Sequence, residues 1–409
     1  MPKLHYLFVL WDGGGAVSAQ LSLIAKLKRK EHQVSVLGEL SMQAEVESYG
    51  CTFYAYQYAP SRLDRKPASD PYPDWNGGSP FTILEKILFT SASAYAKDVL
   101  NVVQQQTFDE VVVDGFLLGG LIGAQASGLP FHAAWPALDL IPHPGRPPDG
   151  LGFKPARHLV QQLRNACLNS IFLGILKMKG KKKINALRDS FGLPRLSNPF
   201  DQYLEAKTVF QLASRHFDFP CRLPVNYRYL GPQLDDPSWS RSAGPYMFPE
   251  SPIILVSLGS SYQQQKALYQ KIIDSLEVLD LPTVVTLGKV FDIGDLQVRT
   301  DTIQIVDSVP HKEILPHCRL VINHGGHGIV MKSVMAGVPQ VVLPLGRDQF
   351  GNAARVDYWQ LGKGGSSKLS VRQLVKLIQA TLEESARWKR NALEMSVKIK
   401  KEMEAVHYF

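Results

Sequence analysis

Two stretches of the chain share one succession of hydrophobic and polar positions. In the first, the unbroken hydrophobic run Leu4–Leu10 leads into Gly13–Gly15, and a second such run follows at Gln33–Leu37. Between these runs, apolar side chains recur at the intervals of one helix face: Val17, Leu21, Ile24 and Leu27. A buried parallel strand is short and uniformly apolar, and its crossover is a helix. The succession therefore predicts the strand–helix–strand start of a parallel sheet.

The same succession begins again in the second half of the chain. The hydrophobic run Pro252–Leu258 leads into Gly259–Ser261, a polar helical stretch and the run Pro282–Leu287. Further strands are predicted at Glu110–Val113, ending at Asp114, and at Arg319–Asn323 and Gln340–Leu345. Further helices are predicted in the glycine-rich stretch up to Gly128, at Gly326–Ala336 and Gln349–Leu361, and from Val371 to the end. We expect an α/β protein with two Rossmann-like, doubly wound parallel sheets.

A linker separates the two predicted domains. After Gly231 the composition turns to Pro, Gly, Asp and Ser, in PQLDDPSWSRSAGPYMFPESP. Such residues favour irregular chain over helices and strands. The prediction is an N-terminal domain over residues 1–232, a linker over 233–251 and a C-terminal domain over 252–409.

Length and composition fit two globular domains and exclude several other classes. The chain has 409 residues, 45% of them hydrophobic, and no short repeat, so it is neither disordered nor fibrous. Four well-separated cysteines without a CxxC pair exclude a disulfide scaffold and a zinc module. No hydrophobic run approaches the ~18 residues of a spanning helix, and Asp12 and three glycines follow the first run instead of a cleavage site. We expect a cytoplasmic protein without stable membrane insertion.

Positive charge is concentrated in one run of lysines. Lys and Arg number 45 against 37 Asp and Glu, a formal net charge of +8, and segment 177–183 holds five lysines in seven residues. An anionic membrane or a nucleic acid could bind this run. The sequence shows no basic amphipathic helix with aromatic anchors beside it, so a solvated helix face is the preferred interpretation. No nucleic-acid partner is expected.

The turn after the predicted strand Arg319–Asn323 has the composition of an anion site. It reads HGGHG over residues 324–328, and a helix is predicted to follow. Glycines let the backbone approach a ligand, and the free N–H groups of a first helical turn attract phosphate. His324 adds a side-chain donor. A tight turn with two incidental histidines is the alternative.

A second polar cluster follows the next predicted strand. Arg347, Asp348, Gln349 and Asn352 lie where open α/β folds bind ligands, at the carboxyl end of the sheet. A carboxylate beside an amide can hydrogen-bond vicinal sugar hydroxyls. As an alternative, Asp348 caps the following helix. Next to a diphosphate site, the cluster indicates a nucleotide sugar.

These motifs resemble a known family. The stretch HGGHGIVMKSVMAGVPQVVLPLGRDQFGNAARV is similar to the donor-binding signature of the nucleotide-sugar glycosyltransferases of GT-B fold, the UDP-glycosyltransferase superfamily, and most to its bacterial natural-product branch, the macrolide and antibiotic type. The resemblance covers roughly residues 250–362, with Val256–Ser261 and Val309–His311, and extends to the opening GGG turn. It implies two domains facing a cleft, with the last helix packing back on the N-terminal domain.

The resemblance assigns roles to individual residues. It implies that His324, Gly326 and Gly328 hold the diphosphate, that Ser260 adds a phosphate contact, and that His327 of the same turn is among the nucleotide-sugar contacts. It also implies that Asp348 and Gln349 bind the sugar hydroxyls. Val309 and His311 would frame the base. Many relatives stack a tryptophan on the base just before the Pro-His pair. Here that neighbourhood reads Asp307-Ser308.

The catalytic histidine of the family is missing. The resemblance places it after the opening glycines, where this chain has Ala16, and the proline expected three residues later is Ala19. The aspartate that orients the histidine corresponds to Asp114, and Asp114 and Asp12 are the candidate catalytic residues. Their alternatives are a strand end and a turn residue. A positioned general base contributes about 10²–10⁴-fold in rate.

The prediction is an inverting hexosyltransferase that uses a UDP- or dTDP-sugar and a small, partly apolar acceptor of natural-product type. With Ala16, three possibilities stay open: an acidic acceptor, a substitute base, or a non-catalytic nucleotide-sugar-binding or partner protein. A GT-B epimerase is a further alternative. No metal is expected, because helix and histidine neutralise the phosphates and the pair Asp235-Asp236 lies in the linker. No cofactor beyond the nucleotide-sugar co-substrate is expected.

Two irregular stretches are candidates for the acceptor side. Residues 59–81 include Tyr72 and Trp75, and residues 132–153 include Trp135. Loops of this kind at the carboxyl edge of a sheet can line an apolar pocket, and ordinary surface loops are the alternative. A dehydrogenase is a weaker reading of Gly13–Gly15, because Ser18 occupies the last position of Gly-x-Gly-x-x-Gly.

Overall fold

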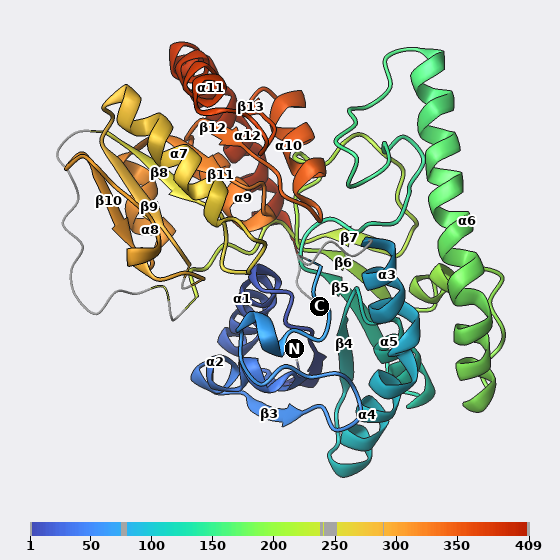
Figure 1. Ribbon diagram of the computed structural model, residues 1–409. Coiled ribbons are helices and arrows are strands. Elements are labelled where there is room, and N and C mark those ends of the chain that lie inside the picture. Colours follow the sequence, from blue (N-terminus) through green and yellow to red (C-terminus); the bar gives the residue numbers. More distant parts are fainter. Residues whose placement is uncertain (1, 75–79, 238–239, 241–251, 289, 407–409) are drawn as a thin grey trace.

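The first half of the chain forms a seven-stranded parallel sheet. The computed structural model describes residues 2–74, 80–237, 240, 252–288 and 290–406. The sheet has the order β3-β2-β1-β4-β5-β6-β7 (Figure 1). Its strands are β1 (His5–Val9), β2 (Gln33–Gly38), β3 (Thr52–Ala55), β4 (Glu110–Asp114), β5 (Phe131–Trp135), β6 (Thr208–Gln211) and β7 (Tyr227–Tyr229). The strand order reverses between β1 and β4, and open α/β sheets bind ligands at such a point.

Helices cover both faces of this sheet. They are α1 (Gly15–Arg29), α2 (Gln43–Ser48), α3 (Pro80–Glu85), α4 (Ala92–Gln105), α5 (Leu118–Ala126) and α6 (Leu159–Ser190). The glycines of α5 are needed for its contact with α4: a Cβ on Gly119 would lie 2.0 Å from the carbonyl oxygen of Ala92, and one on Gly123 would lie 2.7 Å from that of Ala96. The glycine-rich stretch is therefore a close helix–helix contact in the core.

The second half forms a six-stranded parallel sheet with the order β10-β9-β8-β11-β12-β13. Its strands are β8 (Ile253–Ser257), β9 (Thr283–Thr286), β10 (Ile303–Val306), β11 (Cys318–Asn323), β12 (Gln340–Val342) and β13 (Gly362–Gly364), and its helices are α7 (Lys266–Leu279), α8 (His311–Ile314), α9 (His327–Ala336), α10 (Gln349–Tyr358), α11 (Val371–Glu383) and α12 (Ser385–Ala405). Here the order reverses between β8 and β11. The predicted α/β class with two parallel sheets is confirmed.

Some predicted boundaries were wrong. The strand predicted to reach Leu345 ends at Val342, because its edge partner β13 is only three residues long. The helix predicted to reach Leu361 ends at Tyr358. The helical stretch after Val371 is two helices that meet at Glu384. In each case the hydrophobic pattern continues beyond the hydrogen-bonded element.

The two halves meet through the end of α12 and the start of the predicted linker. Ser214 donates a hydrogen bond to the carboxylate of Glu402 near the end of α12. Asp235 accepts from Ser22 of α1 at 2.6 Å, and Asp236 pairs with Lys332 of α9 at 2.5 Å. The aspartates considered as a metal pair thus hold the chain between the two halves. Residues 238–239 and 241–251 of the predicted linker lie outside the described residues.

A buried ionic cluster joins the first sheet to α10. Asp218 follows β6, and its carboxylate lies between two guanidinium groups, 2.5 Å from Arg146 Nη2 and 2.9 Å from Arg355 Nη2. Arg146 also contacts Asp139 at 3.2 Å, and the hydroxyl of Tyr229 donates to Asp218 at 2.8 Å. Burial alone would raise the pKa of Asp218, but the two arginines outweigh it and hold that pKa well below its usual range.

We predict that Asp218→Asn destabilises the protein by about 3–5 kcal/mol at neutral pH, because it leaves two buried guanidinium groups without a counter-charge. Since the folded-state pKa is depressed, this stabilisation is present above the unfolded-state pKa and is lost as the pH falls further. The difference in free energy of unfolding between wild type and variant should therefore become smaller below about pH 4. Urea unfolding at several pH values measures it.

Asp189→Asn is the matched control. Asp189 pairs with Arg195 on the surface, 41% and 73% of the two side chains being exposed, so its loss should change stability little. Equal effects of the two substitutions would contradict the importance of the buried cluster.

Candidate active site

The predicted phosphate turn joins β11 to α9. Gly325 has a positive φ of 92°, and its N–H donates to Asn323 Oδ1 at 2.8 Å. Its carbonyl accepts from Asn352 Nδ2 of α10, also at 2.8 Å. Gly326 precedes the first residue of α9, and no side chain caps that helix end. The N–H groups of the first turn, including exposed Gly328, therefore point out of the carboxyl edge of the sheet.

The ring of His324 is held between two glycines. A Cβ on Gly259 would come within 2.9 Å of the ring and one on Gly326 within 2.7 Å, so both positions require glycine. Burial lowers the pKa of His324 to about 4, with the charge of Arg347 acting in the same direction and a hydrogen bond to the Ser257 backbone opposing both. The imidazole is neutral at physiological pH, and its Nδ1 atom has no hydrogen-bond partner among the described residues.

Ser260 lies in the loop that follows β8, beside this turn in space because β8 and β11 are neighbouring strands. The same loop reaches the first half of the chain. A Cβ on Gly14 would lie 1.9 Å from Ser261 Oγ, so the opening glycine turn and this loop are in contact. The switch points of the two sheets thus face each other.

The second predicted cluster is only partly free to bind a ligand. Asp348 precedes α10 and accepts one hydrogen bond from Asn352, at 2.8 Å. Burial and the nearby charge of Asp149 raise the pKa of Asp348 to about 6, while Asn352 and Arg347 lower it. The Gln349 amide oxygen accepts from the N–H groups of residues 345 and 346, at 2.8 and 3.1 Å, and its nitrogen donates to Gln263 at 2.7 Å. In this arrangement Gln349 holds two loops together, whereas we predicted a sugar contact.

Val309, His311 and His327, three of the predicted nucleotide-sugar contacts, each pack against other residues of the protein. Val309 packs its side chain in the hydrophobic core, so a base would meet only its backbone. Burial and Lys332 lower the pKa of His311 to about 3, with Asp236 opposing. The ring of His327 packs edge-on against Phe217, with 5.9 Å between centroids. That contact places His327 between the two halves, and its role in nucleotide binding stays a prediction.

A shallow recess of about 310 Å³ lies at the carboxyl edge of β9 and β10. It is lined by Val290, Phe291, Asp292, Asp295 and Asp307. Asp307 is one of the residues that replace the tryptophan expected from the resemblance. The recess therefore places the aromatic ring of Phe291, which comes from a different segment, beside Asp307.

Asp12 is fully engaged in structural contacts. Its carboxylate accepts from Gly14 N at 3.1 Å, Ser41 Oγ at 2.7 Å and Arg65 Nε at 2.9 Å, and no part of it is exposed. These contacts hold the glycine turn to the segments that follow β2 and β3. The turn-residue interpretation of Asp12 fits them better than the catalytic one.

Asp114 has a partner that the sequence analysis missed. Gln20 lies one helical turn after Ala16 in α1, and its Nε2 donates to Asp114 Oδ2 at 2.7 Å. The other carboxylate oxygen accepts from Phe116 N at 2.9 Å. Burial raises the pKa of Asp114 to about 7, and these two hydrogen bonds oppose the rise. The available signal was a glutamine on a helix face that is otherwise apolar.

Aromatic residues surround the end of β4. Phe116 lies 5.3 Å from Trp11 and 4.9 Å from Trp135, centroid to centroid. Trp135 and Tyr72 are buried and belong to the core of the first half, so neither is on an exposed loop, and an acceptor pocket lined by residues 59–81 and 132–153 stays a prediction. Trp11 and Phe116 are only partly buried and form its edge. Trp75 lies outside the described residues.

Contacts from the N-terminal half reach the sugar cluster. Arg347 forms a bidentate ion pair with Asp74, at 2.5 and 2.9 Å. Asp149 lies 3.5 Å from Arg355 of α10, and Lys154 pairs with Asp357 of the same helix. The loops around Asp74 and Asp149 therefore meet the segment that carries Asp348.

The sequence and the fold are similar to those of several glycosyltransferases. Residues 270–405 match the family model described as "Erythromycin biosynthesis protein CIII-like, C-terminal domain". The 4'-demethylrebeccamycin synthase of Lentzea aerocolonigenes is 23% identical over 91% of this chain and 90% of that protein. This chain is a homologue of the natural-product glycosyltransferases.

Solved structures agree on the fold of this glycosyltransferase homologue. The glycosyltransferase of kitacinnamycin superposes with a TM-score of 0.76 at 19% identity, covering 98% of this chain and 96% of that one. The glycosyltransferase VinC, solved in complex with dTDP, superposes with a TM-score of 0.65 at 19% identity, with the same coverage. The fold is GT-B, as the resemblance implied.

We predict that Asp114→Asn makes stability less sensitive to pH. The folded-state pKa of about 7 lies above the usual 3.8, so wild-type stability falls as the pH rises between these values. The variant lacks this loss. We compare the free energy of unfolding of the variant minus that of the wild type. This difference should be larger above pH 7 than at pH 4, by on the order of 2–4 kcal/mol in favour of the variant.

Urea unfolding from pH 4 to 8 measures this effect. Asp301→Asn, at an exposed position, controls for the loss of one carboxylate. Parallel pH curves for wild type and Asp114→Asn would mean that Asp114 is not protonated in the folded protein.

Proposed function

We propose that this protein transfers a hexose from a UDP- or dTDP-linked sugar to a small, partly apolar acceptor, with inversion at the anomeric carbon. The observation that carries the proposal is the uncapped start of α9 beside His324, whose ring is held by Gly259 and Gly326. A glycosyltransferase places its leaving group, a nucleoside diphosphate, at such a position. The relationship to natural-product glycosyltransferases supports the same reaction class.

The leaving diphosphate gains its stabilisation from neutral donors. Backbone N–H groups of the first turn of α9 point at the site, and the helix dipole favours negative charge there. A neutral imidazole can donate one hydrogen bond to a phosphate oxygen and costs less to bury than a cation. Ser260 is the further donor that we assign to the phosphates. These groups act on charge that grows as the glycosidic bond breaks, so they lower the barrier.

The sugar and the base are held by the flanking segments. We assign Asp348 to two sugar hydroxyls, since only one of its carboxylate oxygens accepts a hydrogen bond from another side chain in the described part of the chain. Gln349 would join it only if its amide left Gln263. For the base we assign the recess that contains Phe291, which can supply an apolar face in place of the missing tryptophan.

Asp114 is our candidate for the base that accepts the proton of the acceptor. It ends β4 at the switch point of the first sheet, with Trp11 and Phe116 as apolar neighbours. With a pKa near 7, a substantial fraction of Asp114 is ionised at neutral pH and can accept a proton. Gln20 holds one of its oxygens, as the orienting partner of a base should. A carboxylate base of this strength suits an acidic acceptor such as a phenol better than an aliphatic alcohol.

A second candidate function is binding of a nucleotide sugar without transfer. Two observations favour it: Ala16 removes the usual base, and Asp114 is buried and bonded to Gln20. Mass-spectrometric screening of acceptors with UDP-glucose and dTDP-sugars separates the two functions, because only the transferase forms a glycoside.

Donor binding provides the direct test. We predict that UDP or dTDP binds in isothermal titration calorimetry and that His324→Ala weakens binding about tenfold or more, the effect of losing one hydrogen bond to a charged group. His158→Ala, at an exposed position on the N-terminal half, is the matched control. Asp348→Ala should weaken binding of the nucleotide sugar more than of the nucleoside diphosphate. No measurable binding of either nucleotide would overturn the proposal.

Restoring the histidine tests the acceptor side. In Ala16→His, the new imidazole must compete with Gln20 for Asp114, because positions 16 and 20 lie on one face of α1. We therefore expect the double variant Ala16→His/Gln20→Ala to raise transfer to alcohols more than Ala16→His alone. The rates of product formation with matched alcohol and phenol acceptors measure this difference between the two variants. Equal rates for wild type and both variants would mean that Asp114 does not face the acceptor.

A further inference from the structure

Helix α6 lies along the outer side of the N-terminal half, far from the second sheet (Figure 1). Its 32 residues pack on the domain through one face only. Leu176, Gly180 and Ile184 are buried there, and a Cβ on Gly180 would lie 2.5 Å from the ring of Phe89. Lys179 and Lys183 both pair with Glu85 of α3. Two of the five lysines of the run thus serve the fold.

The opposite face of α6 is apolar and open to solvent in its first half. Between Leu159 and Gly174 its exposed positions carry no charge: Leu159, Val160, Gln162, Leu163, Ala166, Cys167, Ser170, Ile171 and Gly174. The large side chains are strongly exposed, Val160 by 74%, Leu163 by 63% and Ile171 by 52%. Isolated apolar residues are normal on a surface, but a charge-free helical stripe of this length is not.

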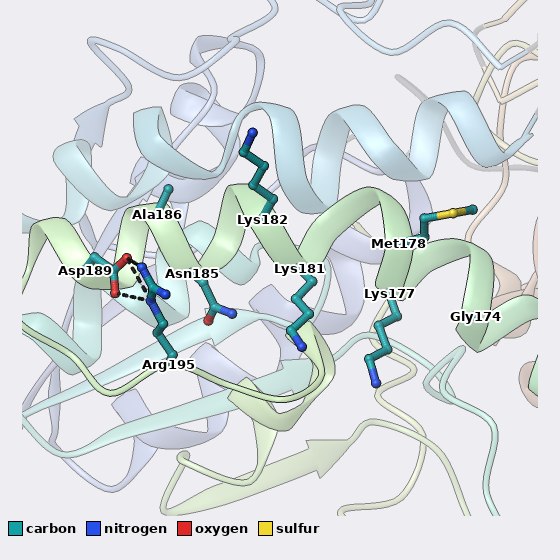
Figure 2. Close-up of a pocket in the computed structure, with 9 residues that line it drawn as sticks. All are labelled: Gly174, Lys177, Met178, Lys181, Lys182, Asn185, Ala186, Asp189 and Arg195. Carbon is teal, nitrogen blue, oxygen red and sulfur yellow. Dashed lines mark hydrogen bonds and ion pairs between the residues drawn. The ribbon is translucent and has the colours of Figure 1, made fainter.

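Unpaired cations lie at both ends of this stripe. Arg157 precedes the helix, and Lys177, Lys181 and Lys182 follow the stripe, with Met178 exposed among them; no carboxylate among the described residues pairs with these four cations. Figure 2 shows Lys177 and Lys181 pointing to the side of the helix on which Arg195 lies. Lys177, Met178, Lys181, Lys182 and Arg195 are among the residues that line an open groove of about 700 Å³.

We propose that the outward face of α6 binds the surface of an anionic lipid bilayer, with its apolar stripe among the acyl chains and its lysines at the headgroup phosphates. Binding of a helix at the membrane interface gains from the apolar area that it buries and from electrostatic attraction to anionic lipids, and the stripe and its basic neighbours supply both. No helix in the described parts of the chain is long and apolar enough to cross a membrane, so this attachment is peripheral. A solvated lysine face without a membrane partner is the alternative that this proposal replaces.

A second copy of the chain fits this face less well. An antiparallel pair of α6 helices would bring the lysines of one copy to Arg157 of the other, and a parallel pair would bring the lysines together. Both arrangements put like charges opposite each other, whereas an anionic surface complements both ends at once.

Vesicle co-sedimentation tests the proposal. The full chain should bind vesicles of phosphatidylcholine and phosphatidylglycerol at least tenfold more tightly than vesicles of phosphatidylcholine alone, and added salt should weaken that binding. Each basic residue near such a surface contributes about fivefold. Lys181→Glu/Lys182→Glu should therefore reduce binding at least tenfold, while Lys398→Glu/Lys400→Glu makes the same change of charge on exposed α12 and should not act through this face.

The apolar stripe has its own variant and control. Val160→Asn/Leu163→Asn/Ile171→Asn should abolish most binding, whereas Leu204→Asn/Val278→Asn, at exposed positions elsewhere, should preserve it. Circular dichroism and UDP or dTDP titration check that the variants fold, and they separate a failure here from a failure of the proposed transferase activity. Equal binding to both vesicles, binding retained by both α6 variants, or dimers in sedimentation velocity without vesicle binding would each overturn the proposal.

Discussion

The carboxylate of Asp218 is the contact on which the arrangement of the two sheets depends most directly. It lies after β6 in one half and receives Arg146 from that half and Arg355 from α10 of the other. Charges this deeply buried tolerate little displacement, because each loses its counter-charge when the geometry changes. The cluster therefore holds α10 in a definite position, and α10 begins directly after Asp348. The packing of the two halves and the position of Asp348 are therefore linked through one helix.

Both halves use the same architectural rule for different chemistry. In each sheet the strand order reverses beside the first strand, and polar side chains follow the two strands at that point. In the second half these are Ser260 and His324, beside backbone N–H groups suited to an anion. In the first half they are Asp12 and Asp114, of which one is neutralised by Arg65 and the other is held by Gln20. One switch point thus offers N–H donors, and the other offers two buried carboxylates.

The strands, and the strand-to-helix turn at residues 324–328, could be predicted from the sequence because their signals are local. Unbroken hydrophobic runs followed by glycines identify β1, β8 and β11, and the turn at His324 needs only neighbouring residues. Prediction from the sequence failed where long-range contacts decide. Nothing near Gln349 shows that its amide meets Gln263, and nothing near Trp135 shows that β5 buries it. The exposed stripe of α6 was missed for the same reason, because its exposure depends on which face the rest of the domain covers.

The bidentate pair between Arg347 and Asp74 has a consequence for the timing of a catalytic cycle. It joins the loop that carries Asp348 to a loop of the opposite half, close to where Gly14 meets Ser261. In the transferase reaction proposed above, a donor and a spent nucleotide that pass between these loops would require the pair to part and re-form in every turnover. Opening of the cleft would then be a step with its own barrier, and a surface ion pair would contribute to the residence time of the product.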